Sequence, residues 1–196
     1  VADAWTWVQR RHRSWRWMRA EFSGSTSSGD NSYSASDFGI SSRFGRWITD
    51  DLVDGYLPMS IYLASDSTAA DEGALRQVSW EVWRTRWGRG THDNAKPTEY
   101  AIGPDNAFRP GATPDDTYTV NGEYQKSAQT LSADADEPEC PADFHDVITW
   151  KALLLYAEYD EAPMHIARAI RNYEIMMDEL ERDQLAELRI AGTPLA

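Results

Sequence analysis

Cysteine and lysine are scarce in this sequence, and long apolar runs are absent from it. Its 196 residues include one cysteine, Cys140, which excludes an internal disulfide and a cysteine-rich zinc site. No stretch approaches the roughly 18 consecutive apolar residues of a membrane-spanning helix. Only Lys96, Lys126 and Lys151 occur, so arginine supplies most of the 19 basic residues. Arginine favours packed ion pairs at interfaces, although genomic base composition explains the bias equally well.

Positive charge is in deficit overall, and it is unevenly distributed. Asp and Glu number 32, and the net charge is −13. A non-specific nucleic-acid binder needs a basic footprint, which the whole chain does not offer. Residues 1–22 nevertheless carry five arginines against two carboxylates, whereas residues 134–139 carry four carboxylates and no base. Such asymmetry suits a protein whose two ends meet different partners, and it is equally compatible with a solvated surface.

The rest of the composition is that of a folded chain. Hydrophobic residues make up 41% and charged residues 26%, which suits one domain or a small domain with a large insertion. Nine Trp and nine Tyr are many for this length. Because aromatic rings bury large areas, they indicate either an aromatic-rich core or a surface that uses rings for contact.

Residues 3–22 predict an amphipathic helix with Asp3 as its N-cap. Its apolar stripe consists of Trp5, Val8, Trp15, Met18 and Phe22. Trp7 and Trp17 lie off this stripe and would need a second contact. The chain enters the pattern directly from Val1, which is compatible with a natural start further upstream. A Ser/Gly run over 23–31 predicts a flexible loop after the helix.

Residues 32–140 contain frequent turn-forming residues and short apolar runs. We predict a bent strand over 53–64, with Pro58 at an edge or bulge. Strands over 98–103, 106–109 and 117–125 are predicted to form a meander.

One segment in this middle region is ambiguous. Trp80, Trp83 and Trp87 have helical spacing, whereas Val78, Trp80 and Val82 alternate as in a strand. We favour a short helix over 74–87.

Two helices are predicted in the last third of the chain. The first begins near Pro141, which suits a first helical turn, and is broken at 160–163. The second runs from about 163 to 190. Its apolar seam at 4-3-4-3 spacing consists of Ile166, Ile170, Tyr173, Met177 and Leu180. The short break predicts an antiparallel hairpin, with the N-terminal helix as the third member of a bundle.

The predicted fold class is therefore α+β, an antiparallel helical bundle that carries a β-rich insertion. The bundle would comprise residues 1–22 and 141–190. The loop and β-rich insertion would comprise 23–140, and a C-terminal tail would comprise 191–196.

The sequence offers little for catalysis or metal binding. Glu161 and His165 stand four apart on one helix face, but no second pair supplies further ligands, so a surface pair is favoured. Cys140 and His145 superficially resemble a nucleophile and its base. The acidic surroundings of Cys140 would raise its pKa, which is the wrong direction for a nucleophile. We therefore expect no enzyme activity, no metal and no cofactor.

Three further segments favour ordinary structural interpretations. Residues 134–137 are acidic but lack the glycine and spaced ligands of a calcium loop, so a solvated turn is favoured. Residues 88–90 contain two glycines without the following Lys-Ser or Lys-Thr of a phosphate loop, which favours a turn. The arginines of residues 10–13 lie beside two tryptophans and could hold a single nucleic-acid strand. An amphipathic helix with a charged face is the favoured interpretation.

Three regions of the chain form an ordered pattern. Residues 4–9 (AWTWVQ) and 14–18 (SWRWM) combine an alanine-tryptophan pair, a glutamine and a tryptophan-rich stretch. Residues 97–124 fit a β-meander, and residues 141–148 (PADFHDVI) precede a helix that contains the 167–173 stretch. In this order they resemble the head-to-tail adaptor (connector) family of tailed bacteriophages.

The resemblance implies a structural protein of the virion neck, assembled in the host cytoplasm, with no active-site residues. It implies a ring of twelve copies that docks on the portal protein and grips the downstream tail or nozzle protein, without a membrane. An obligate ring needs large interfaces rich in aromatics and Arg. DNA would pass through without specific binding, and a net charge of −13 permits an acidic lumen that repels phosphate.

Two other interpretations remain open at this point. Exposed Trp and Tyr could make the chain a glycan- or ligand-binding module, and an enzyme of unrecognised type is the third possibility. Oligomeric state distinguishes a glycan-binding module from a ring subunit, because such a module is usually stable as a monomer or small oligomer.

Two places in the chain are candidates for contacts with the portal or with neighbouring subunits. At the C-terminal end, 185–196, apolar residues continue after the seam weakens at Gln184, although a frayed terminus would look similar. At the N-terminal end the off-stripe tryptophans lie among arginines. The candidate residues are Leu185, Leu188, Ile190, Leu195, Trp7, Trp17, Arg10 and Arg13. We also expect the isolated chain to aggregate, or to be a monomer that forms a ring only on a portal.

Overall fold

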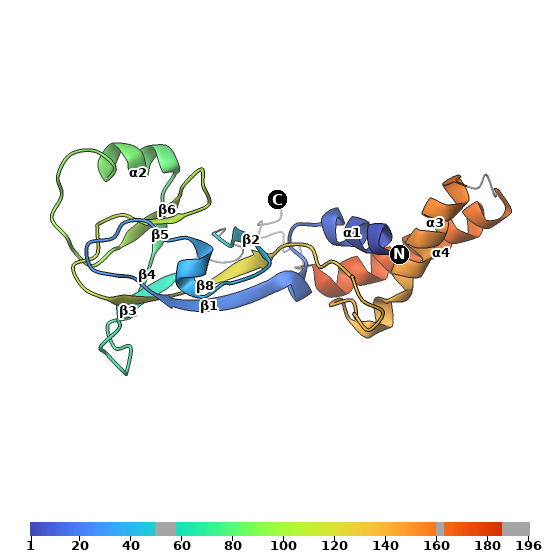
Figure 1. Cartoon of the computed structure of the whole chain (residues 1–196), viewed down its shortest axis with the longest axis horizontal. Helices are drawn as coiled ribbons and strands as arrows, with labels where there is room; N and C mark the ends of the chain where they lie inside the picture. The colour runs from blue at the N-terminus through green and yellow to red at the C-terminus, as the bar shows by residue number, and fades with distance from the viewer. Residues whose placement is uncertain (50–57, 160–162, 186–196) are drawn as a thin grey trace, which may run out of the picture. The chain divides into compact units, whose positions relative to one another are not determined.

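The computed structural model describes residues 1–49, 58–159 and 163–185, the last range without the side chains of 163–165. The chain divides into two compact units. Unit 1 is formed by residues 1–18 and 128–196, and unit 2 by residues 19–127. Figure 1 shows unit 1 as mainly helical and unit 2 as mainly strands.

Within its described residues, unit 1 is built from three α-helices, which are α1 (Ala2–Arg11), α3 (Asp146–Tyr159) and α4 (Pro163–Gln184). Short 3₁₀ turns at η1 (Arg16–Met18) and η3 (Ala142–Phe144) precede the next regular elements. Helix α3 packs against α4, and α1 packs against α3. Buried apolar residues of all three helices form a single core, because each helix has one face that needs cover.

Indole rings dominate the core of unit 1. Trp5 and Trp15 are fully buried, and the half-buried Trp17 stacks on both, at ring-centroid distances of 6.5 and 4.4 Å. The Trp15 Nε1 group donates to the carbonyl oxygens of Val8 (3.2 Å) and Gln9 (3.1 Å). These bonds satisfy the buried indole and close the chain back over the end of α1.

Gln9 ties the segment before α3 to helix α1. Its side chain is buried, its Nε2 donates to the Gln129 carbonyl oxygen at 2.9 Å, and its Oε1 accepts from the Gln129 amide at 2.6 Å. The Gln129 side chain in turn accepts a hydrogen bond from Trp5 Nε1 at 3.1 Å. The two glutamines thereby satisfy backbone groups of a segment that has no regular secondary structure.

Unit 2 contains two sheets and one α-helix in its described residues. The five-stranded sheet consists of β1 (Arg19–Ser25), β2 (Phe44–Trp47), β3 (Ser60–Leu63), β4 (Gly73–Ala74) and β8 (Tyr118–Lys126). Its order is β1-β8-β3-β4, with β2 also paired to β8. The second sheet has the order β5 (Arg76–Gln77), β6 (Glu99–Ile102), β7 (Phe108–Pro110). The short elements are η2 (Ala35–Phe38) and α2 (Trp80–Arg86).

Aromatic packing also holds unit 2 together. Phe38 stacks on Phe22 and Tyr33 at 5.4 and 5.5 Å, and it meets Phe108 edge-on at 5.5 Å. The antiparallel register places Phe22 opposite Gly122. A Cβ at Gly122 would lie 2.8 Å from the Phe22 ring, so the glycine makes room for it.

The predicted fold class is wrong. The described residues form four α-helices and two sheets, and the predicted three-helix bundle with a β-rich insertion is only partly consistent with them. The N-terminal helix ends at Arg11, His12 is extended, and residues 19–25 form β1. Strand β1 pairs with β8 about a hundred residues away, and this non-local pairing overrides the helical period.

Two predictions for the middle of the chain also need correction. The three predicted strands exist, but β6 and β7 pair in one sheet whereas β8 belongs to the other, so they form no meander. The helix predicted over 74–87 begins only at Trp80, because the Ser79 side chain accepts from the Val82 amide at 3.3 Å and caps it there. Residues 53–57 of the predicted bent strand lie outside the described residues.

The seam predicted on the last helix departs from the structure at its second position. Met177 and Leu180 are buried as expected, but Ala169 is buried while Ile170 is 41% exposed. The predicted extension from 186 to 190 lies outside the described residues.

Candidate interaction surfaces

One face of α1 carries a groove lined by charged and aromatic side chains. The groove has a volume of about 410 Å³. Its lining residues are Asp3, Thr6, Trp7, Arg10 and Arg11. They recur at three- and four-residue steps, so they share one side of the helix.

Trp7 is the centre of this face. Its side chain is 38% exposed, and the Lys151 Nζ lies 3.9 Å from the centroid of its ring. Tyr173 of α4 meets the ring edge-on at 5.7 Å. Burial raises the pKa of Tyr173 to about 12. Because α1, α3 and α4 all contribute, the ring is held in place while one side stays open to a partner.

Several basic residues lie at and just beyond the end of α1. Glu181 of α4 accepts from Arg11 Nε at 3.4 Å and bonds His12 Nε2 at 2.8 Å. These contacts tie the end of α1 to α4. Arg10 is exposed beside the groove, and Arg13 is exposed just beyond the helix.

Helix α3 carries large apolar side chains on more than its buried side, and several of them are exposed. Within it only Val147, Ile148 and Ala157 are buried. We call the exposed large apolar side chains of the two last helices the hairpin residues, namely Leu155, Tyr156, Tyr159, Ile170 and Ile175. Tyr159 is 89% exposed. Several large apolar side chains exposed on two adjacent helices are typical of an interaction surface, so these residues are a candidate contact with a partner.

The predicted contact residues that the structure describes lie in three different environments. Trp7 and Arg10 share the α1 groove, and Arg13 lies near it in sequence. Trp17 packs inside unit 1 within the indole stack. Leu185 is half-buried against the helical core. The remaining predicted residues, Leu188, Ile190 and Leu195, lie outside the described residues.

The hairpin residues were not among the predicted contacts. Their signal was nevertheless present in the sequence, because residues 152–157 (ALLLYA) are apolar over more positions than one helix face requires. A heptad seam needs only two positions in seven. The structure leaves exposed some of the apolar residues that this seam does not use, Leu155 and Tyr156 among them.

The segments considered for chemistry have structural roles. Burial raises the pKa of Cys140 to about 11, and His145 Nε2 lies 3.1 Å from the Cys140 carbonyl oxygen. Asp136 accepts from the Ser132 and Ala133 amides at 2.6 and 2.8 Å and so closes its own turn. The side chains of Glu161 and His165 lie outside the described residues.

The described ranges offer neither a metal site nor a membrane span. They contain no group of three or more His, Cys, Asp or Glu side chains that could hold a metal ion. None of the helices in these ranges is long and apolar enough to cross a membrane.

A larger depression of about 770 Å³ lies on unit 2. Three carboxylates, Glu21, Glu72 and Glu123, line it together with apolar residues that include Phe22 and Met59. Among the described residues no Trp or Tyr lines it. This lining does not favour a glycan-binding module, because such a module would stack sugar rings on exposed indole or phenol groups.

One known family covers nearly the whole chain. The model of the family described as SU10 adaptor protein matches residues 1–195. The match therefore spans both compact units. No curated protein matches the chain.

Proposed function

The chain belongs to the SU10 adaptor protein family, a phage head-to-tail adaptor family, and from this premise we propose that it is a structural subunit of the connector ring between head and tail. The resemblance predicted from the sequence is thereby confirmed. In the proposal, twelve copies form a ring on the portal protein and hold the next tail component. The ring lies in the neck of the virion.

The exposed hairpin residues carry this proposal. Large apolar side chains at Leu155, Tyr159 and Ile170 are exposed in the isolated chain. Burying a side chain of this size from full exposure is worth about 1.5–3 kcal/mol, so Tyr159, which is 89% exposed, would gain most of it, and Leu155, which is 36% exposed, about a third. A subunit that is complete only in an assembly needs such surfaces, whereas a self-sufficient monomer does not.

The α1 groove is a second proposed contact surface. It combines an indole ring with arginines, and these are the residue types enriched at protein interfaces. Arg10 is exposed in the groove, and Arg13 is exposed just after the end of α1. The net charge of −13 supports passage of DNA without binding, because a mainly acidic protein repels phosphate.

The hairpin can be tested with the double variant Leu155→Asp/Ile170→Asp. Both side chains are exposed, so the variant is expected to fold, as measured by circular dichroism. It should fail to co-sediment with the portal protein. The exposed Glu158 of the same helix supplies the control, because Glu158→Ala should co-sediment as the wild type does. Undiminished binding of the double variant would contradict the role of the hairpin.

The C-terminal segment is a further proposed contact. Leu185 is half-buried, and the apolar residues that follow it in the sequence extend to Leu195. Truncation after Ala186 should leave the chain folded but abolish assembly on the portal. If assembly is untouched, the C-terminal segment makes no required contact, and docking uses the hairpin residues or the arginine-rich surface of α1.

A further inference from the structure

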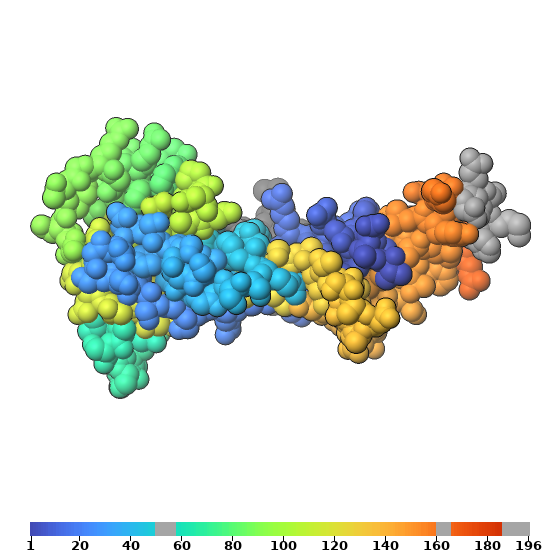
Figure 2. Space-filling model, in the orientation of Figure 1, coloured from blue at the N-terminus to red at the C-terminus, as the bar shows by residue number. Residues whose placement is uncertain are grey.

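Unit 2 has two projecting ends that differ in chemistry. Helix α2 lies on one side of the unit and the β3–β4 hairpin on the opposite side (Figures 1 and 2). The first end carries what we call the Arg–Trp face, consisting of Arg76, Trp80, Val82, Arg84, Arg86 and Arg89. The second carries the acidic face, consisting of Asp66, Asp71, Glu72, Asp115 and Asp116.

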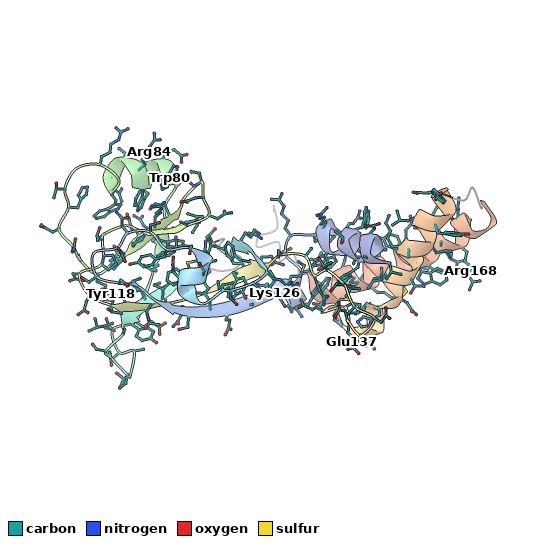
Figure 3. The ribbon with its side chains drawn as sticks, in the orientation of Figure 1. Trp80, Arg84, Tyr118, Lys126, Glu137 and Arg168 are labelled. Carbon is teal, nitrogen blue, oxygen red and sulfur yellow. The ribbon has the colours of Figure 1, made fainter. Side chains whose placement is uncertain are left out.

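The Arg–Trp face is held rigidly. Trp80 is half-buried and stacks on Trp83 at 5.1 Å between ring centroids. Trp83 is anchored because its Nε1 donates to the Pro110 carbonyl oxygen at 2.7 Å. Val82 is 42% exposed on the same helix, and Figure 3 shows Arg84 pointing away from the sheet. Trp80 and Arg84 are four positions apart and share one side of α2, so a fixed indole and an exposed guanidinium group stand together, as at an interface centre.

The Arg–Trp face keeps positive charge although the chain is acidic. Arg76 and Arg86 both pair with the single carboxylate of Glu99, the latter at 2.6 Å. Two guanidinium groups thus share one negative charge. Within the described residues, Arg84 and Arg89 are exposed and take part in no ion pair. The exposed Glu81 is the carboxylate on α2 itself.

The acidic face has an excess of negative charge. Asp71 pairs with Lys96 at 2.6 Å, and Asp115 accepts from the Tyr118 hydroxyl at 2.6 Å. Glu72 accepts from the Ser60 hydroxyl at 2.5 Å. Asp116 is also exposed. Five carboxylates therefore stand against one lysine, so this end of the unit is strongly negative.

We propose that the Arg–Trp face of one copy docks on the acidic face of the next copy around the ring. The inference rests on the proposed function, since it names the contact by which the ring closes. Complementary faces on different sides of one rigid unit make a head-to-tail interface, and repeating such an interface closes a ring when the rotation allows. The opposite charges steer the approach, and the Trp80 indole supplies apolar contact.

The test reverses the charge of each face by two exposed residues. Variant A is Arg84→Glu/Arg89→Glu, and variant B is Glu72→Arg/Asp116→Arg. Each variant alone places like charges in contact, so ring formation on the portal should weaken by about tenfold or more. Negative-stain microscopy and sedimentation measure it. The variant Arg84→Lys/Arg89→Lys keeps the charge and should form rings like the wild type.

Complementation makes the test specific. In a mixture of A and B, the reversed face of each copy meets the reversed face of the other, so alternating rings should reappear. A chain carrying all four substitutions should also form rings by itself. Rings formed by A alone and B alone, or a mixture that stays unassembled, would overturn the inference.

The alternative occupant of the Arg–Trp face is DNA. If variant A forms normal rings but binds duplex DNA more weakly in an electrophoretic shift assay, the subunit contact is refuted. Failure of the proposed function gives a different result, because in that case the wild-type chain itself forms no ring on the portal. Wild-type rings that tolerate both reversals leave the proposed function intact and reject this interface alone.

Discussion

Replacing Gln9 by leucine is expected to loosen unit 1 selectively. The Gln9 side chain is 2% exposed and makes two hydrogen bonds to the Gln129 backbone, at 2.9 and 2.6 Å. Leucine fills similar space but leaves both backbone groups without their partner. A buried orphaned group costs about 1–3 kcal/mol, and since Gln129 is only half-buried, water recovers part of this. We expect a net cost of about 1.5–3 kcal/mol.

Hydrogen exchange of the α1 amides measures this cost locally. Since ~1.4 kcal/mol corresponds to a factor of ten, exchange through opening of α1 should accelerate roughly 10- to 100-fold. Amides of strand β8 belong to unit 2 and provide an internal reference. Their exchange should stay unchanged.

Gln184 supplies the matched control for Gln9. It is also buried, but within the described residues its side chain bonds only the neighbouring Asp183, at 2.6 Å. Gln184→Leu orphans no backbone group, so its effect on α1 should be less than about threefold. Equal acceleration in the two variants would refute the argument, because burial alone would then explain it.

Three further predictions concern single residues. Hydrogen bonds from Arg76 first, and then from Arg86, hold the pKa of the Glu99 carboxyl below its ordinary value. The ionised carboxylate therefore stabilises unit 2 above that ordinary value, and this stabilisation is lost as pH falls through the folded pKa. In urea unfolding, Glu99→Gln should reduce the loss of stability at acid pH, and an unchanged loss would contradict this. Burial raises the pKa of Cys140 to about 11, so iodoacetamide should label it slowly at pH 8 and rapidly in urea, as mass spectrometry would report. Gly24→Ala places a Cβ 2.7 Å from Phe38 Cα and should cost about 1–3 kcal/mol in thermal unfolding. Gly73→Ala meets nothing within 4 Å and should be nearly neutral.

The N-terminal stripe shows how much of the fold could be predicted from the sequence. Trp5, Val8, Trp15 and Met18 were placed on one buried face, and all four lie in the core of unit 1. The continuous helix that was to carry them is wrong, since α1 ends at Arg11. Periodicity predicts which residues are buried, but two short elements separated by a bend can bury the same residues as one long helix.

The pairing of strands within the sheets could not be predicted from local sequence patterns. Strand β8 pairs with β1, β2 and β3, and the paired residues are 55 to 106 positions apart in the chain. The sequence located β8 itself through its alternating residues, but alternation does not state which strand it will join. Turn signals between adjacent strands favour a meander, but in the structure β8 pairs with strands that are distant in the sequence.

The contact surfaces were predictable only in part. Trp7 stood out because it lies off the apolar stripe, and it is exposed. The hairpin residues had an equally clear signal in the apolar stretch at 152–157, but a helix in a bundle accounts for such residues until burial is known. Exposure is the property that separates the two cases, and it depends on how closely α3 and α4 pack.

A reconstruction of the virion that contains this chain tests the central claim most directly. The account predicts a ring of twelve copies in the neck, in contact with the portal on one side and with a tail component on the other. The hairpin residues should be buried between protein subunits there. Single copies located elsewhere in the particle, or a neck without this chain, would contradict the account.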